Sequence, residues 1–221
     1  MSNIVQKVWR MLDNSPSIRR DLSLGLINTS ALARYLIEKN KVEGTLDGVI
    51  GAIRRYDHGK HKEMFLEAYK LLGQTVNLFT RRKVAEIALK KDEVVQQLLP
   101  KLFGIIKYIQ GDVLRIMQAN ESIRLLIDEK NLERVTNVFP KDKILVIEKD
   151  LAEIDIYIHP EMQDAPGVLA VIANELTING INIFEVMTCP PEMLFIVKGE
   201  DLLQAHDVLN RLCQTHENDV L

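Results

Sequence analysis

One short stretch carries the residue types that a binding site for a charged ligand needs. Residues 164–172 read DAPGVLAVI, where Asp164, Pro166 and Gly167 follow a strand-like run and precede an apolar helical pattern. The first turn of a helix leaves backbone N–H groups unpaired and has a positive dipole end, so it favours an anion. Gly167 permits close approach to the backbone, and Pro166 presets the first turn. The stretch is either an ordinary strand-to-helix turn capped by Asp164 or a site for a ligand that carries charge.

No catalytic machinery accompanies this stretch. The sequence has no phosphate loop, no GxGxxG and no evident catalytic carboxylate pair, so we expect neither an enzyme nor a bound cofactor. His58 and His61 lie beside Asp57, but such a group in a linker is more typical of solvated side chains than of a metal site, and no metal is expected. Cys189 has no partner at a spacing typical of nucleophilic catalysis.

The charge is distributed unevenly along the chain. Residues 1–73 carry a net +4, residues 74–141 carry +4 and residues 142–221 carry −11, against a total of −3. With 47% hydrophobic residues the composition is typical of a globular protein with a core. No apolar run approaches the roughly 20 residues of a membrane span, and the first residues do not resemble a signal peptide. We therefore expect a cytoplasmic protein without a membrane segment.

An internal repeat organises the last two thirds of the chain. KVAEIAL (83–89) matches DLAEIDI (150–156) at an offset of 67, and the segment 120–139 matches 190–209 at an offset of 70. The repeat predicts a first copy at 74–141 and a second copy at 142–221.

Each copy is predicted to be strand–strand–helix–strand–strand–helix. In the second copy the strands are expected at 144–147, 152–158, 181–188 and 193–197, with helices before Gly180 and over 202–212. In the first copy the leading strands are expected at 76–79 and 84–89, before a helix in DEVVQQLLPKLFGIIKY. The fold class is α+β, with a four-stranded antiparallel ferredoxin-like sheet in each copy.

The motif D-A-P-G-V-L, followed after a helix by N-G-I-N-I (179–183), resembles the ligand-binding signature of ACT domains. The tandem copies and the permuted strand order most resemble the regulatory half of aspartokinases. The resemblance implies that an amino-acid effector binds at the strand-to-helix loop, commonly across an interface with another ACT domain. The binding residues it implies are Asp164, Ala165, Pro166, Gly167, Val168, Leu169, Asn182 and Ile183.

The charges of a free amino acid fit these residues. Its carboxylate can accept hydrogen bonds from the backbone N–H groups of Gly167, Val168 and Leu169. Its ammonium can bind Asp164, and the Asn182 amide can hydrogen-bond to a polar side chain of the ligand. The first copy lacks Pro-Gly at the matching place and has Asp112 at the position of Asn182. We therefore expect the first copy to be a structural partner and a candidate wall of the pocket.

The front domain, residues 1–73, is predicted to be helical. Ser15 and Pro16 suit the start of a helix that Gly25 can end, and Asn28 or Thr29 can cap the next one. Helices at 30–39 and 46–56 resemble the pair of a winged-helix or helix-turn-helix domain. The candidate DNA contacts are Thr45, Arg54, Arg55, Lys60 and Lys62.

Two functions remain open from these residues. One is an amino-acid-sensing regulator whose front domain binds DNA, an arrangement similar to archaeal predicted regulators of amino-acid metabolism. The other is a regulatory subunit that controls an amino-acid biosynthetic enzyme through protein contact, because a helical domain can equally bind a partner protein. In either case the edges of ACT-type sheets favour a homodimer.

Overall fold

The computed structural model describes residues 4–57, 61–74 and 77–214. These residues form two compact units. The first comprises the residues up to Lys70 together with Ala165–Val168, and the second comprises Leu71–Asp164 and the residues from Leu169 onward.

The first unit is built from helices. They are α1 (Ile4–Asp13), α2 (Pro16–Ser23), α3 (Thr29–Asn40), α4 (Leu46–Arg54) and α5 (His61–Leu72). The Asn28 side chain caps α3 by accepting from the backbone N–H groups of Ser30 and Ala31, and Gly25 (φ 74°) follows the end of α2. Ser15 is the N-cap residue of α2 and Pro16 opens the helix, as predicted, but the Ser15 side chain makes no capping hydrogen bond.

One hydrophobic core joins α1, α3 and α4 of this unit. Fully buried side chains include Val8, Leu12, Val49 and Ile53. Trp9 lies at the edge of the core and donates from Nε1 to the carbonyl oxygen of Ala52 at 2.9 Å, which ties α1 to α4. The described residues of the first unit contain no strand, so they provide no β-wing.

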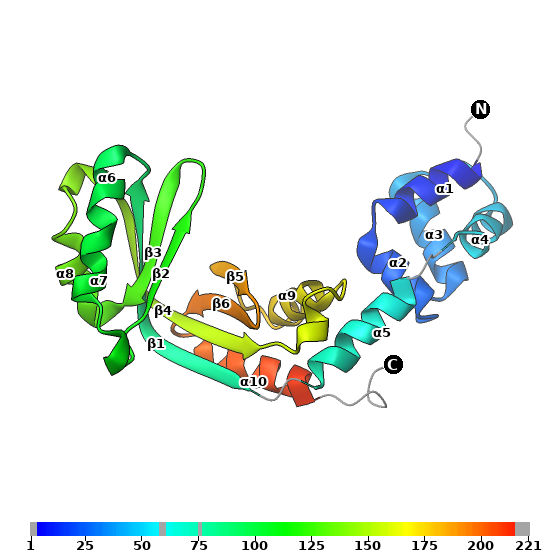
Figure 1. Cartoon of the computed structure of the whole chain (residues 1–221). Coiled ribbons are helices and arrows are strands. Elements are labelled where there is room, and N and C mark those ends of the chain that lie inside the picture. The colour runs from blue at the N-terminus through cyan, green and yellow to red at the C-terminus, as the bar shows by residue number, and fades with distance from the viewer. Residues whose placement is uncertain (1–3, 58–60, 75–76, 215–221) are drawn as a thin grey trace. The chain divides into compact units, whose positions relative to one another are not determined.

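The second unit is an antiparallel sheet with helices. Its strands are β1 (Leu78–Lys90), β2 (Leu114–Gln118), β3 (Ser122–Asp128), β4 (Ile144–Tyr157), β5 (Glu185–Cys189) and β6 (Glu192–Lys198). Its helices are α6 (Glu93–Leu98), α7 (Leu102–Ile105), α8 (Leu132–Thr136), α9 (Val168–Ile178) and α10 (Leu202–Gln214). The strand order is β2-β3-β1-β4-β6-β5, and the sheet curls with α10 running along β1 and β4 (Figure 1).

The first two strands predicted for each copy are one continuous strand in the structure, which corrects the sequence analysis. β1 and β4 each bend at a bulge, where Lys83 (φ 56°) and Asp150 (φ 53°) adopt the left-handed conformation. A bulge accommodates an extra residue without ending the strand. The charged residues between the two predicted strands of each copy therefore continue the strand.

The bulges allow the two copies to exchange strand segments. Residues 78–82, before the first bulge, pair with 152–156 of the second copy, whereas 144–148 pair with 86–89 of the first copy. Each copy therefore has three strands of its own and receives a fourth from the other.

The strand pairing repeats with the same offsets as the sequence. Val84 pairs with Asp128 in the first copy, and Leu151 pairs with Lys198 in the second. These positions differ by 67 residues in β1 and β4 and by 70 residues in β3 and β6. Positions so related are called equivalent below.

Two helix and strand boundaries differ from those predicted. The long helix expected after residue 91 is divided into α6, a 3-10 turn at Leu99–Lys101 and α7, because Pro100 has no backbone N–H and disfavours a continuous helix. Gly180 (φ 75°) follows α9 as predicted, but β5 begins at Glu185 instead of residue 181.

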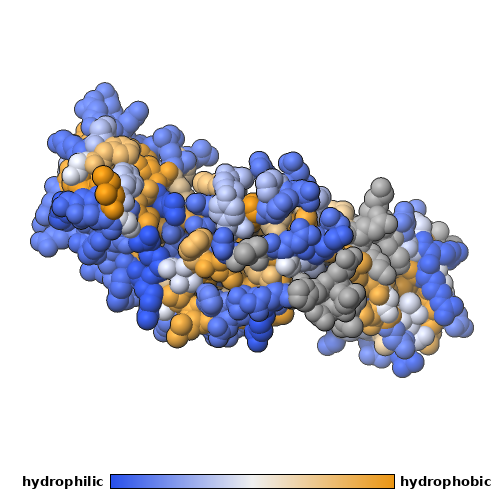
Figure 2. All heavy atoms as spheres, turned by 60° about the horizontal axis from the view of Figure 1, so that its bottom comes forward, coloured by the Kyte–Doolittle hydropathy of each residue, from blue (hydrophilic) through white to orange (hydrophobic). Residues whose placement is uncertain are grey.

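The helix-covered face of the first copy buries an apolar core. Ile87 and Leu89 of β1 and Leu125 and Ile127 of β3 pack with α6, α7 and α8. The visible surface is mostly hydrophilic, and its apolar side chains form separate patches (Figure 2).

The opposite face of the sheet holds charged pairs at equivalent positions. In one, Arg115 of β2 binds Glu153 of β4 through two hydrogen bonds of 3.1 and 3.2 Å. The equivalent residues are Glu185 of β5 and Glu86 of β1, so a carboxyl group replaces the arginine. Glu86 is 2% exposed and forms an ion pair with Arg124 of β3.

Candidate functional site

The predicted ligand loop lies between β4 and α9. After β4 a 3-10 turn at Pro160–Met162 buries Met162, and residues 163–167 then lead into α9. Val168, Val171 and Ile172 are buried and fix the start of the helix. The loop is therefore attached at both ends to packed elements, while Asp164 and Pro166 are exposed.

Gly167 is required by its backbone conformation. Its φ of +97° lies in a region that other residues rarely adopt. A Cβ atom there would lie 3.7 Å from the Cβ of Ala68 and 3.9 Å from the carbonyl oxygen of Met64, both ordinary contacts within the same unit. The conformation, and not a lack of space, therefore selects glycine.

Asp164 has a carboxylate that is open to a ligand. It is exposed and makes no hydrogen bond or ion pair with any described residue. The carboxylate is therefore not engaged as a cap of α9 in this structure. Ala165 is half-buried, and Leu169 is 41% exposed in the first turn of α9.

Asn182 lies at the opposite end of α9 from Asp164. The backbone N–H of Ile181 donates to the carbonyl oxygen of Leu176 at 3.0 Å, so Asn182 is held beside the C-terminal end of the helix. Leu176 is about 12 Å along the axis from Val168 at 1.5 Å per residue. One small amino acid cannot contact both Asp164 and Asn182 of the same chain. Asn182 itself is exposed, and Ile183 is half-buried.

The equivalent position in the first copy is occupied by structural contacts. Asp112 is buried, and one carboxylate oxygen accepts from the backbone N–H of Lys107 and from the Asn131 amide. The other oxygen lies 2.6 Å from Lys130 Nζ, and the contact with this ammonium group is the main cause that lowers the pKa of Asp112 to about 2. Asp112 is thus engaged within the fold.

The candidate DNA contacts have different roles in the first unit. The Thr45 hydroxyl caps α4 by accepting from the backbone N–H of Gly48 at 3.2 Å. Arg54 and Arg55 are exposed, although Arg55 Nε donates back to the carbonyl oxygen of Gly51. Lys60 lies outside the described residues, and only the backbone of Lys62 is described, within α5.

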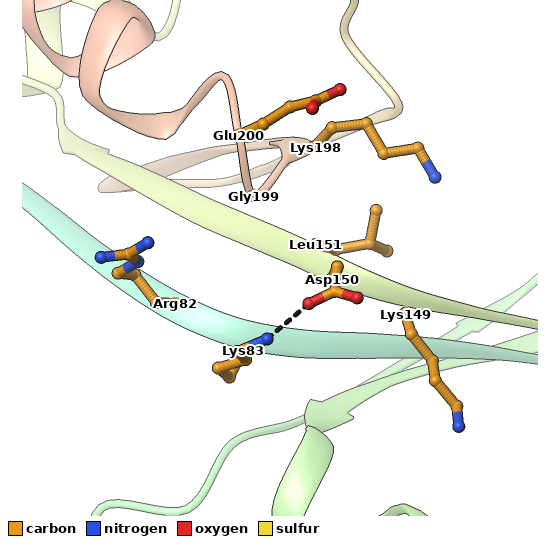
Figure 3. Close-up of a pocket in the computed structure, with 8 residues that line it drawn as sticks. All are labelled: Arg82, Lys83, Lys149, Asp150, Leu151, Lys198, Gly199 and Glu200. Carbon is orange, nitrogen blue, oxygen red and sulfur yellow. Dashed lines mark hydrogen bonds and ion pairs between the residues drawn. The ribbon is translucent and has the colours of Figure 1, made fainter.

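A hollow of about 460 Å³ lies at the two bulges, among residues that the sequence analysis did not single out (Figure 3). It is lined by Arg82, Lys83, Lys149, Asp150, Leu151, Lys198, Gly199 and Glu200. Taken alone in the sequence, each of these charged residues resembles an ordinary solvated side chain. One feature of the sequence could have indicated the hollow. Lys and Arg are scarce after residue 141, and two of the few that occur there, Lys149 and Lys198, line the hollow.

No group of three or more metal-ligating side chains occurs among the described residues. Within the same part of the chain, no helix is both long and apolar enough to cross a membrane.

Solved structures of aspartokinases share the fold of a large part of this chain. Aspartate kinase of Clostridium acetobutylicum is 16% identical with a TM-score of 0.50, over 63% of this chain and 35% of its own. The structure of aspartokinase alpha and beta subunits is 16% identical with a TM-score of 0.51, and the match covers 64% of this chain and 99% of that one. The regulatory subunit of aspartate kinase from Thermus flavus is 13% identical with a TM-score of 0.52, and the match covers 63% of this chain and 98% of that one.

These likenesses support an ACT-like α+β fold for the matched part, and at such identities they show the fold alone. The match spans about a third of the Clostridium enzyme, so only that portion of the enzyme is shared. No family model and no curated protein matches the chain.

Proposed function

We propose that the chain is an amino-acid-sensing regulatory protein without a reaction of its own, and that its two copies are ACT repeats with permuted strand order. The observation that carries the proposal is the unpartnered carboxylate of Asp164 next to left-handed Gly167 at the start of α9. The effector carboxylate binds the N–H groups of Gly167, Val168 and Leu169, and its ammonium binds Asp164. The ACT-like fold supports this assignment.

The separation of Asp164 and Asn182 favours a homodimeric site. Because the two residues lie at opposite ends of α9, Asn182 reaches an effector only if a second chain supplies it. The edge strands β2 and β5 can pair with another chain. We therefore propose that two chains complete the site, with Asn182 of one facing Asp164 of the other.

Replacing Asp164 by alanine should weaken effector binding about tenfold or more, because a charge-assisted hydrogen bond is worth roughly 1.5–3 kcal/mol. Gly167→Val should abolish binding, since valine disfavours the φ of +97°. Isothermal titration measures both effects, and circular dichroism checks the fold. Glu121→Ala, which removes another exposed carboxylate of the second unit, is the control. Equal affinities of Asp164→Ala and this control would refute the assigned role.

We further propose that the first unit binds DNA and that the effector biases this contact. Exposed Arg54 and Arg55 at the end of α4 support the proposal. A DNA-binding assay with and without pooled amino acids tests it. The expected result is binding that weakens with salt, as phosphate contacts require, and that changes when the effector is added. Absence of salt-sensitive binding in both conditions would remove DNA as a partner.

A regulatory subunit that controls a biosynthetic enzyme is the second candidate. Leu26 and Tyr35 are 56% and 51% exposed in the first unit, so a partner protein that covers them would bury apolar surface. Affinity purification should then recover a biosynthetic enzyme in stoichiometric amount. Replacing both residues by serine should prevent that recovery and leave DNA binding unchanged.

A further inference from the structure

The hollow at the two bulges is built from three segments of the second unit. β1 supplies Arg82 and Lys83, β4 supplies 149–151, and the turn between β6 and α10 supplies 198–200 (Figure 3). Its volume of about 460 Å³ lies in the range of small-molecule sites.

Positive charge is concentrated at this hollow. Four cations and two carboxylates line it. Residues 142–221 contain only 4 Lys and Arg against 15 Asp and Glu, and two of those cations, Lys149 and Lys198, are here. Glu129 and Glu148 lie beside Lys83 and Lys198, so the cations that favour an anionic ligand are the two without such a partner, Arg82 and Lys149.

Two of these cations are available to a ligand. The side chains of Arg82 and Lys149 are exposed and make no hydrogen bond or ion pair with any described residue. Lys83 binds Asp150 at 2.5 Å and lies 3.8 Å from Glu129, and Lys198 lies 3.2 Å from Glu148. The paired cations are thus held at the hollow, and the two unpaired ones flank it (Figure 3).

The backbone around the hollow is fixed and strained. Lys83 and Asp150 occupy equivalent positions, and both have a positive φ, of 56° and 53°. The N–H of Gly199 donates to the carbonyl oxygen of Asp150 at 2.6 Å, and a Cβ at residue 199 would lie 2.8 Å from that oxygen. Strain of this kind is characteristic of ligand sites.

We propose that this hollow binds a phosphate group, either as the free ion or as the monoester of a small molecule. Arg82 offers a planar fork for two phosphate oxygens, and the ammonium groups of Lys149 and Lys83 add positive charge. Among the described residues that line the hollow, Leu151 is the one apolar side chain and none is aromatic, so none of them would stack on a nucleobase. The site is independent of the amino-acid site proposed at α9.

Isothermal titration of the full chain with inorganic phosphate and with glycerol phosphate tests the proposal, with sodium chloride holding the ionic strength constant. We expect saturable binding of at least one of them. Arg82→Gln and Lys149→Gln should each weaken it about tenfold, the loss expected for one charge-assisted contact. Lys91→Gln, which removes an exposed lysine elsewhere in the unit, should leave the affinity unchanged.

Tighter binding of the ester would identify a phosphorylated small molecule as the ligand, and tighter binding of inorganic phosphate would identify the free ion. Three results would overturn the site. They are no saturable binding of either probe up to about 10 mM, equal binding of acetate, or equal losses in Lys91→Gln and in the two variants of the hollow. Effector binding is measured on the same variants and should not change, which separates this site from the one at α9.

Discussion

Replacing Arg124 by methionine should lower the free energy of unfolding of the second unit by about 1–3 kcal/mol, less than the loss for a fully buried ion pair because the Arg124 side chain is 41% exposed. Glu86 is 2% exposed, and Arg124 is its ion-pair partner across β1 and β3. The variant leaves the Glu86 carboxylate buried without its counter-charge. Chemical denaturation monitored by circular dichroism measures the change.

Two further variants separate charge from packing at this position. Lys107→Met removes an exposed cation and should change stability by no more than about 0.5 kcal/mol. The double variant Arg124→Met/Glu86→Leu should recover much of the loss, because an apolar pair leaves no unpaired charge. A single variant as stable as Lys107→Met would show that the ion pair contributes little.

Glu185 makes stability depend on pH. Burial raises its pKa to about 7, the hydrogen bond and charge of Glu86 add to the shift, and the charge of Arg124 opposes it. Neither Glu86 Oε2 nor Glu185 Oε2 has a hydrogen-bond donor among the described residues, so a proton on Glu185 provides one for Glu86.

The sign of the effect follows from the raised pKa. The protonated carboxyl stabilises the folded state below its ordinary pKa of 4.5, and this contribution is lost as the pH rises through about 7. Glu185→Gln remains neutral and should be more stable than the wild type at pH 8 by roughly 1–2 kcal/mol, allowing for solvent screening. At pH 4.5 the two proteins should be nearly equal.

Thermal unfolding from pH 4.5 to 8 measures this difference as a rise in Tm of roughly 3–6 °C at the upper end. Asp155, whose pKa is raised to about 6 mainly by burial and by the charges of Glu192 and Glu153, retains its own pH dependence in this variant. Glu133→Gln, at an exposed position, is the control. A constant difference between wild type and Glu185→Gln at every pH would contradict the shared proton.

The strands of the second copy could be predicted from the sequence because the alternation of apolar and polar residues along a strand determines which face of the sheet a side chain occupies. Ala152, Ile154 and Ile156 are buried on one face of the strand, but Glu153 between them is also buried, so the strand is not half-buried as the alternation predicts. Gly180 follows the helix that it was expected to end. Alternation does not determine the pairing partner of a strand. The exchange of residues 78–82 and 144–148 between copies therefore required the structure, as did the bulges that permit it.

The candidate site could be predicted only in part, because the sequence does not show which distant segments come together. Asp164 and Gly167 are close in sequence, and their exposure and backbone conformation agree with a ligand loop. Asn182 was grouped with them by motif, but its position depends on where the chain goes after α9, and it lies at the far end of the helix. The cations of the hollow come from three separate segments, so their proximity is a property of the sheet.

Isothermal titration of the wild-type chain against the twenty amino acids, after removal of any co-purified ligand, is the most direct test of the sensing function. The predicted result is saturable binding of at least one amino acid below the millimolar range, lost in Gly167→Val and weakened about tenfold in Asp164→Ala. If no amino acid binds below the millimolar range, the stretch at 164–169 is only a turn into α9 and the proposed function is contradicted.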